Sequence, residues 1–334
     1  MSASCTGQPT DHEALLVMQG SSTTVLADVT DATHPHPICT ITGGSVPQLV
    51  TQRMISWSAT QTAGQSGPSM LLTMDLFAGS GPTTIASWTG GLFMDGLFAW
   101  SPDESSLAYV TSDAGGVNLH LLSGGGDRVV VTLGAVPGRG VNLSEDSAFI
   151  GFSADGTYFA LVQTFSGTGP HLQVRKTKDG TLAYSQADGT MATWSHSGSD
   201  LYFREPGKTV IKQWDPTTGV TQLFGAQQAW ILPTTNPGDD SVAYSLLDSA
   251  GLPHVWIYGH GGRAGGELGN IRTSPVFLNT TQLFLAEAEA CTNCGPGPGY
   301  KLDDKTFVYN LGTQSETASS IQSVLGAWPR VGQT

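Results

Sequence analysis

The pattern with the most explicit chemistry is Cys291-x-x-Cys294, towards the C-terminal end of the 334-residue chain. Two cysteines at this spacing can form a disulfide, a redox pair or half of a zinc site. A structural zinc site needs two more ligands, which the N-terminal region would have to supply. The candidates there are Cys5, Cys39, His34 and His36. No βαβ pattern surrounds the motif, which argues against a thioredoxin-like redox pair.

Disulfide formation is the interpretation that the cysteines favour. The chain has four cysteines, 43 glycines and only 14 Lys and Arg residues. An even cysteine count in such a chain is typical of exported proteins that keep disulfides. We expect a bridge between Cys5 and Cys39, with Cys291 and Cys294 bridged or paired within one loop.

Signatures of catalysis are weak. The Gly-x-Ser-x-Gly elbow of serine hydrolases is absent from the sequence. His120, His171 and His254 recur at related places in a repeated pattern, which favours structural roles. Three adjacent carboxylate pairs lack the loop spacing with which calcium is usually bound. These pairs are Glu145-Asp146, Asp239-Asp240 and Asp303-Asp304. We therefore expect no catalytic residue and no resident cofactor, with calcium as the one alternative.

Charge excludes two classes of partner. The net charge is -13, from 14 Lys and Arg against 27 Asp and Glu. Nucleic-acid binding requires a basic surface that displaces counterions, and an anionic membrane would repel an acidic protein. No apolar run approaches the roughly 18 residues of a membrane helix, so no transmembrane segment is expected.

The cysteines also favour export. We expect a periplasmic, cell-surface or extracellular protein whose leader has already been removed, with the cytoplasm as the alternative. Cys5 would then be a candidate lipid anchor, although "SASC" lacks the aliphatic residue usual three places earlier.

A repeated hairpin organises the chain. "FAWSPDESSLAYV" (98–110) is an apolar strand, a Ser-Pro-Asp turn and a second apolar strand. The same plan recurs in "FIGFSADGTYFALV" (149–162) and "MATWSHSGSDLYFR" (191–204). Asp-Gly and Ser-Gly suit the tight turns that close hairpins. In the blade that contains residues 98–110, which is the second along the chain, we expect strands near 92–100, 106–111, 117–122 and 128–133.

Apolar residues at the ends of the first strands act as anchors that define the period. They are Leu49, Trp100, Phe152, Trp194, Leu232, Phe277 and Trp328. The mean spacing is about 48 residues, within the range for four-stranded propeller blades. This predicts an all-β, seven-bladed β-propeller of antiparallel blades, with six blades as the alternative. We expect a single domain over 1–334.

The two ends of the chain complement each other. Residues 10–44 read as three strands without an innermost one, and 322–329 reads as an innermost strand without partners. We expect these segments to form one blade, which would close the ring and remove a sheet edge.

"WSPDESSLAYVTSDAGGVNLHLLS" (100–123) resembles the repeat of TolB-like, or WD-like periplasmic, propellers. Glu104 stands where that repeat usually has glycine. The likeness is good over about three blades and implies a propeller fold. It also implies export, and most of its members are binding or assembly modules. Others are the propeller halves of prolyl-oligopeptidase-type enzymes.

Loop lengths suggest a working face. Connections such as "SPDES" and "SADGT" are short, whereas "GAVPGRGVNLSEDS" and "EACTNCGPGPGYKLDDK" (289–305) are long. The long set falls between second and third strands and between blades, which share one face of a propeller. Insertions concentrated on one face usually mark a binding surface. The candidate residues there are Arg139, Glu145, Trp230, Arg272, Tyr300, Asp303 and Asp304.

The sequence therefore predicts a non-enzymatic, exported binding or assembly module whose long-loop face binds a protein, peptide or glycan. One alternative is an enzyme with a site in the central channel, of the metal-dependent lyase, lactonase or hydrolase type. Another is a structural surface protein that associates with itself.

Overall fold

The computed structural model is built from β-strands. It describes residues 1–7, 14–18, 23–29, 32–43, 47–51, 53–59, 68–89, 97–113, 116–134, 149–164, 170–205, 210–225, 231–238, 241–259, 266–291 and 300–328. Within these ranges it contains no helix long and apolar enough to cross a membrane.

Four sheets have four strands each. One contains β5 (Gln48–Leu49), β6 (Met54–Ala59), β7 (Ser69–Asp75) and β8 (Thr83–Trp88). The next contains β9 (Phe98–Trp100), β10 (Leu107–Asp113), β11 (Gly116–Ser123) and β12 (Gly126–Gly134). The third contains β13 (Phe149–Phe152), β14 (Tyr158–Thr164), β15 (Pro170–Lys176) and β16 (Leu182–Ala187). The fourth contains β17 (Thr190–Trp194), β18 (Leu201–Arg204), β19 (Val210–Asp215) and β20 (Gly219–Gly225).

A seven-stranded sheet follows along the chain. It runs through β21 (Ile231–Thr235), β22 (Val242–Leu247), β23 (Pro253–Tyr258), β24 (Gly266–Phe277), β25 (Gln282–Ala290), β26 (Tyr300–Asn310) and β27 (Ser315–Ser319). Its strand β24 is 12 residues long and serves two neighbours at different places. The first part pairs with β23, with His254 opposite Ile271, and the second part pairs with β25, with Arg272 opposite Glu287. β24 is therefore the last strand of one four-stranded unit and the first of the next.

The N-terminal sheet joins the two ends of the chain. Its order is β1 (Ser2–Cys5), β4 (His36–Thr42), β3 (Thr23–Asp28), β2 (Ala14–Met18) and β28 (Ser323–Trp328). β28 pairs antiparallel with β2, with Ala14 opposite Trp328 and Met18 opposite Ser323. The C-terminal strand β28 therefore lies in one sheet with the N-terminal strands β2, β3 and β4. The outermost strand, β1, was not predicted, and Cys5 is disulfide-bonded to Cys39 across the β1–β4 pair.

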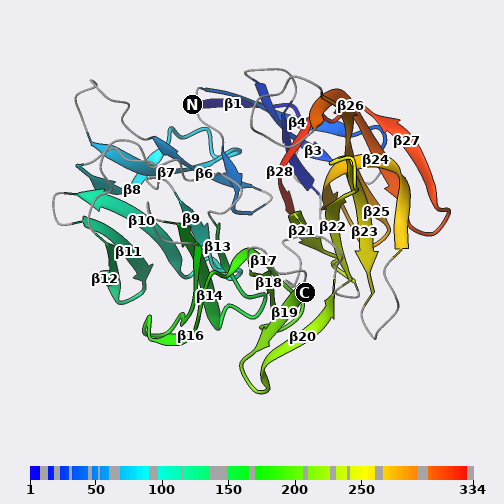
Figure 1. Cartoon of the computed structure of the whole chain (residues 1–334). Helices are drawn as coiled ribbons and strands as arrows, with labels where there is room; N and C mark the ends of the chain where they lie inside the picture. Colours follow the sequence, from blue (N-terminus) through cyan, green and yellow to red (C-terminus); the bar gives the residue numbers. More distant parts are fainter. Residues whose placement is uncertain are drawn as a thin grey trace.

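The sheets are arranged around a common centre, towards which their first strands lie (Figure 1). All seven anchors fall in these strands, which are β5, β9, β13, β17, β21, β24 and β28. Two of the anchors also connect neighbouring sheets, because Trp100 Nε1 donates to Ser56 Oγ (3.1 Å) and Trp194 Nε1 donates to the Gly151 carbonyl (2.9 Å). In the β9–β12 sheet, the first strand begins at Phe98 in the described part of the chain, whereas we expected it to begin near residue 92. Residues 91–96 lie outside the described part.

The repeated serine explains why the hairpins resemble one another. The backbone N–H of Ser101 donates to the Ser106 carbonyl, and that of Ser153 donates to the Tyr158 carbonyl. Each serine hydroxyl also donates to the turn aspartate two residues later, at 2.6 Å. Both serines are buried, so these bonds satisfy polar groups that would otherwise be costly. The Ser-x-Asp pattern therefore fixes the turn geometry.

Apolar clusters fill the seams between consecutive sheets. Leu107 and Tyr109 pack towards the β5–β8 sheet, whereas Ala108 and Val110 pack towards the β13–β16 sheet. This is the period-2 alternation of a strand that is buried on both faces. A further cluster contains Val25 of β3 and Phe284 of β25, so the N-terminal sheet packs against the end of the seven-stranded sheet.

Glu104 offers a test of the turn. It has a φ of 61°, whereas the corresponding Gly156 has a φ of 69°. A side chain in this left-handed region costs roughly 1–2 kcal/mol. We expect Glu104→Gly to be more stable than Glu104→Ala by about 1 kcal/mol in chemical denaturation.

The reciprocal variant Gly156→Ala should lose about 1 kcal/mol by the same argument. Its new Cβ would meet Pro102 Cδ at 3.7 Å, which is an ordinary contact. The lost stability would therefore measure the backbone strain of the left-handed conformation and not a steric clash. Equal stability of Glu104→Gly and Glu104→Ala would contradict this account of the turn.

Candidate functional site

The predicted site residues that the structure describes gather on one four-stranded unit. Arg272 lies in β24, and Tyr300 and Asp303 lie in β26. Asp304 also belongs to β26, although its side chain is not described. Arg139, Glu145 and Trp230 lie outside the described residues.

Both ends of the predicted loop over residues 289–305 are strand, which corrects the sequence-based expectation there; residues 292–299 lie outside the described part of the chain. β25 continues to Ala290 and β26 begins at Tyr300, with these two residues opposite each other. Glu289 lies opposite Lys301, so their charges are paired across the hairpin at 3.2 Å. Such cross-strand pairs support strand geometry in a segment whose polar composition suggested a loop.

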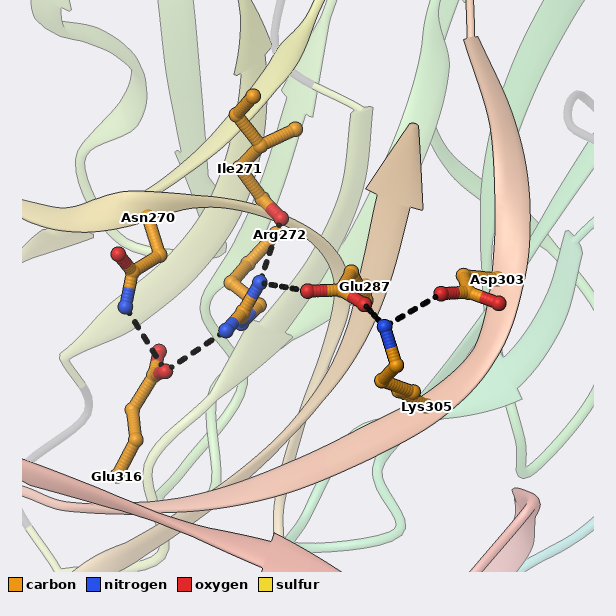
Figure 2. A network of polar contacts seen from close by, with 7 residues as sticks. All are labelled: Asn270, Ile271, Arg272, Glu287, Asp303, Lys305 and Glu316. Carbon is orange, nitrogen blue, oxygen red and sulfur yellow. Dashed lines mark hydrogen bonds and ion pairs between the residues drawn. The ribbon is translucent and has the colours of Figure 1, made fainter. Parts of the chain in front are cut away.

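Arg272 is the centre of a polar network in this unit (Figure 2). Its Nη1 lies 3.2 Å from Glu287 Oε1, and its Nη2 lies 3.0 Å from Glu316 Oε2. The guanidinium carbon also lies 3.9 Å from the centroid of the Phe307 ring. Because the side chain is only 9% exposed, Arg272 lies in the seam and holds β24, β25 and β27 together.

The network continues from the buried arginine to the surface. Lys305 Nζ lies 3.0 Å from Glu287 Oε2 and 3.1 Å from Asp303 Oδ2. Hydrogen bonding to Glu287, and then to Asp303, raises the pKa of Lys305. Lys305 therefore remains a cation and shares Glu287 with Arg272.

Two buried atoms of the network have no hydrogen-bond partner among the described residues. They are Arg272 Nε and Glu316 Oε1. Glu316 also accepts from the Asn270 side chain at 2.9 Å. Burial makes each charge dependent on its partners, since an unpaired buried charge is strongly destabilising.

The edge of the β25–β26 hairpin combines this rigid base with an exposed apolar residue. Leu302 is 58% exposed, among the most exposed large hydrophobic side chains described. Lys301 and Glu289 pair on one side of it in sequence, and Asp303 pairs with Lys305 on the other. We call Glu289, Lys301, Leu302, Asp303 and Lys305 the hairpin surface. Leu302 lies opposite Ala288, whereas Lys301 lies opposite Glu289, so the alternation of β26 places the leucine on the other face of the strand from this ion pair.

The cysteines do not form the zinc site that was considered. Cys5 and Cys39 are bonded to each other, as predicted, and Cys291 is disulfide-bonded as well. Cys294 lies outside the described residues. Within the described ranges, no three His, Cys, Asp or Glu side chains are grouped to hold a metal ion. Calcium binding stays an untested prediction.

Sequence reasoning missed Glu287, Lys305 and Glu316. A signal for Glu287 was present in "AEAEA" (286–290), where the alternation places Glu287 and Glu289 on one face of a strand. Glu316 had no comparable signal in the sequence. Its contact with Arg272 depends on the position of β27, which pairs with β26 and lies two strands away from β25 in the sheet.

Comparison with known proteins identifies the fold class. No protein-family model and no curated protein sequence matches the chain. The β-propeller domain of the Trilobed protease from Pyrococcus furiosus matches with a TM-score of 0.54 and 8% identity, over 82% of this chain and 83% of that one. A prolyl endopeptidase matches with a TM-score of 0.61 and 11% identity, over 95% of this chain and 49% of that one. The fold is therefore that of a β-propeller.

TolB from Acinetobacter baumannii is also a structural neighbour. It matches with a TM-score of 0.47 and 15% identity, over 93% of this chain and 80% of that one. The chain spans about half the length of the prolyl endopeptidase. At these identities the similarities describe the fold alone.

Replacing Arg272 tests the buried network. We expect Arg272→Met to lower the free energy of unfolding by about 3 kcal/mol, because Glu316 would lose its buried cation. Glu287 would retain Lys305, so adding Glu316→Gln should recover part of the loss. Denaturant titration of the single and double variants measures both effects.

The matched control is Lys301→Met, which removes an ion pair whose side chains are 57% and 48% exposed. Exposed pairs contribute about 1 kcal/mol or less. If Arg272→Met lowered the free energy of unfolding no more than Lys301→Met does, the buried network would not hold the three strands together as described.

Proposed function

We propose that the chain is an exported, non-enzymatic binding or assembly module that recognises its partner through the hairpin surface. The partner class that fits best is a protein or peptide, because an exposed leucine flanked by paired charges resembles a small protein-binding site. A glycan partner is the alternative expected from the sequence.

The observation that carries this proposal is the exposure of Leu302 on a fixed support. The charges beside it in sequence already have partners within the chain, so none of them would have to be buried unpaired when a partner binds. Arg272 and Glu287 hold the strands from which this surface projects. Little conformational freedom would then be lost on association, which favours affinity.

We further propose that the strands form one closed propeller domain of seven four-stranded units. Support comes from three observations. β24 belongs to two units, β28 completes the N-terminal sheet, and an apolar cluster joins that sheet to β25 and β26. A single closed body of this kind would present two faces on which a partner could bind.

Export is supported by the cysteine chemistry. The Cys5–Cys39 disulfide is of a kind that persists in oxidising compartments and is rare in the cytosol. The periplasm, the cell surface and the extracellular space all satisfy this condition.

The test is retention of a partner from the envelope fraction of the source organism. We expect immobilised wild-type protein to retain a specific protein, and Leu302→Glu to reduce its recovery at least tenfold, as for a central contact residue. The matched control is Leu182→Glu, at a leucine that is 51% exposed on the outer strand β16. Quantitative mass spectrometry provides the measurement.

Equal recovery of the same proteins by Leu302→Glu and Leu182→Glu would contradict a role for the hairpin surface. Turnover of a saccharide or lactone by purified protein, abolished by a chelator, would instead favour the enzyme alternative.

A further inference from the structure

A pocket of about 380 Å³ lies between β8 and the β9–β12 sheet, away from the hairpin surface. Its volume falls within the roughly 300–1,000 Å³ typical of small-molecule sites. The lining residues that matter here are Ile85, Trp88, Tyr109, Thr111, His120 and Asp127. They combine aromatic surface with a few polar groups, as ligand pockets commonly do.

The polar groups of the pocket form one ordered network. Tyr109 donates its hydroxyl to Asp127 Oδ2 at 2.8 Å, and His120 Nδ1 lies 3.2 Å from the same oxygen. His120 Nε2 lies 3.0 Å from Thr111 Oγ1. A carboxylate only accepts, so Nδ1–H donates to Asp127; in the neutral ring, Nε2 then accepts from the Thr111 hydroxyl. The His120 and Tyr109 rings stack with centroids 4.8 Å apart.

Tyr109 brings a hydroxyl to a position that is apolar in two of the other seams. Tyr109 follows its anchor Trp100 by nine residues, and Leu161 and Phe203 follow Phe152 and Trp194 by the same interval. Leu161 and Phe203 belong to the apolar clusters of their seams. The Tyr109 hydroxyl therefore exceeds what apolar packing needs. The pairing of a third-strand histidine with a fourth-strand carboxylate, by contrast, recurs in His254 and Glu267, at 2.9 Å.

One donor at this pocket is buried without a partner, and one acceptor is open to solvent. The buried Trp88 Nε1–H has no acceptor in the described part of the chain. Asp127 Oδ2 accepts from two donors, and the carboxylate is 42% exposed, so it can accept a further hydrogen bond from a ligand or from water. An unpaired buried donor is destabilising, so a ligand that supplies an acceptor gains from pairing it.

The Trp88 donor and the Asp127 acceptor together select among ligand classes. An anion would be repelled by Asp127, a simple cation would offer no acceptor to Trp88, and an apolar ligand would pair with neither. A hydroxyl both donates and accepts, so a neutral polyhydroxylated ring satisfies both groups. Its C–H face would pack against Trp88 and Ile85.

We propose that this pocket binds a neutral saccharide unit, with Asp127 accepting from one ligand hydroxyl and Trp88 donating to a ligand oxygen. The site is separate from the hairpin surface and does not depend on the function proposed for that surface. Burial, and then the bond to Asp127, raises the pKa of Tyr109, so its hydroxyl remains a donor that orients the carboxylate at neutral pH.

The experiment is saturation-transfer NMR with the full chain and four probes: methyl glucoside, methyl galactoside, methyl N-acetylglucosaminide and cellobiose. We expect at least one sugar to bind, and Asp127→Asn to weaken its affinity about tenfold or more, as for loss of a charged acceptor. The matched control is Asp179→Asn, an exposed turn aspartate that hydrogen-bonds to Thr181, which should bind as the wild type does.

A second variant guards against misfolding. Ser87 is an exposed residue on the pocket wall, so Ser87→Trp should fill the pocket without disturbing the core and should abolish sugar binding. Binding by none of the four sugars would overturn the proposal, as would binding that survives Ser87→Trp. Displacement of the sugar by N-acetylglycinamide or methylammonium at equal concentration would also overturn it, in favour of an amide or a cation.

Discussion

Burial of both faces of every sheet is the constraint on which the rest of the structure depends. In β10, Leu107 and Ala108 are neighbours in sequence but pack in different seams. Each fully buried side chain of this size contributes roughly 1.5–3 kcal/mol, and that gain requires a sheet on either side. No unit can therefore satisfy its apolar surface alone. The same need accounts for the pairing of β28 with β2, since the N-terminal strands would otherwise lack an inner neighbour.

The repeat could be predicted because each unit needs the same local contacts, which require the same residue types at the same positions. Trp100 and Trp194 recur because their indoles bond to the preceding sheet, and Ser101 and Ser153 recur because their hydroxyls fix the turn. Features that occur once were not predictable in this way. β1 has no counterpart in other units, and the continuity of β24 depends on how two units meet.

The partners of the polar residues could not be predicted from the repeat pattern. His120 shares its sequence context with other third-strand histidines, which favoured a structural role, but its partner Asp127 lies on the next strand. Arg272 was singled out for its place before a first strand, yet its side chain is buried and its partners come from β25 and β27. In both cases the residue type was visible in the sequence, whereas the partners were set by packing. Both networks border an apolar cluster: Tyr109 belongs to one such cluster, and Phe307, which Arg272 contacts, packs against another.

Closure through β28 is the central claim, and a short C-terminal deletion tests it most directly. Removing 323–334 would leave β2 with an unpaired edge, while removing 329–334 spares β28 and is the matched control. Calorimetry of the two proteins beside the full chain would decide the matter. The account predicts that the longer deletion abolishes the cooperative transition of the full chain, or causes aggregation, and that the control melts normally. If the longer deletion melted as the full chain does, the claim of closure would be contradicted.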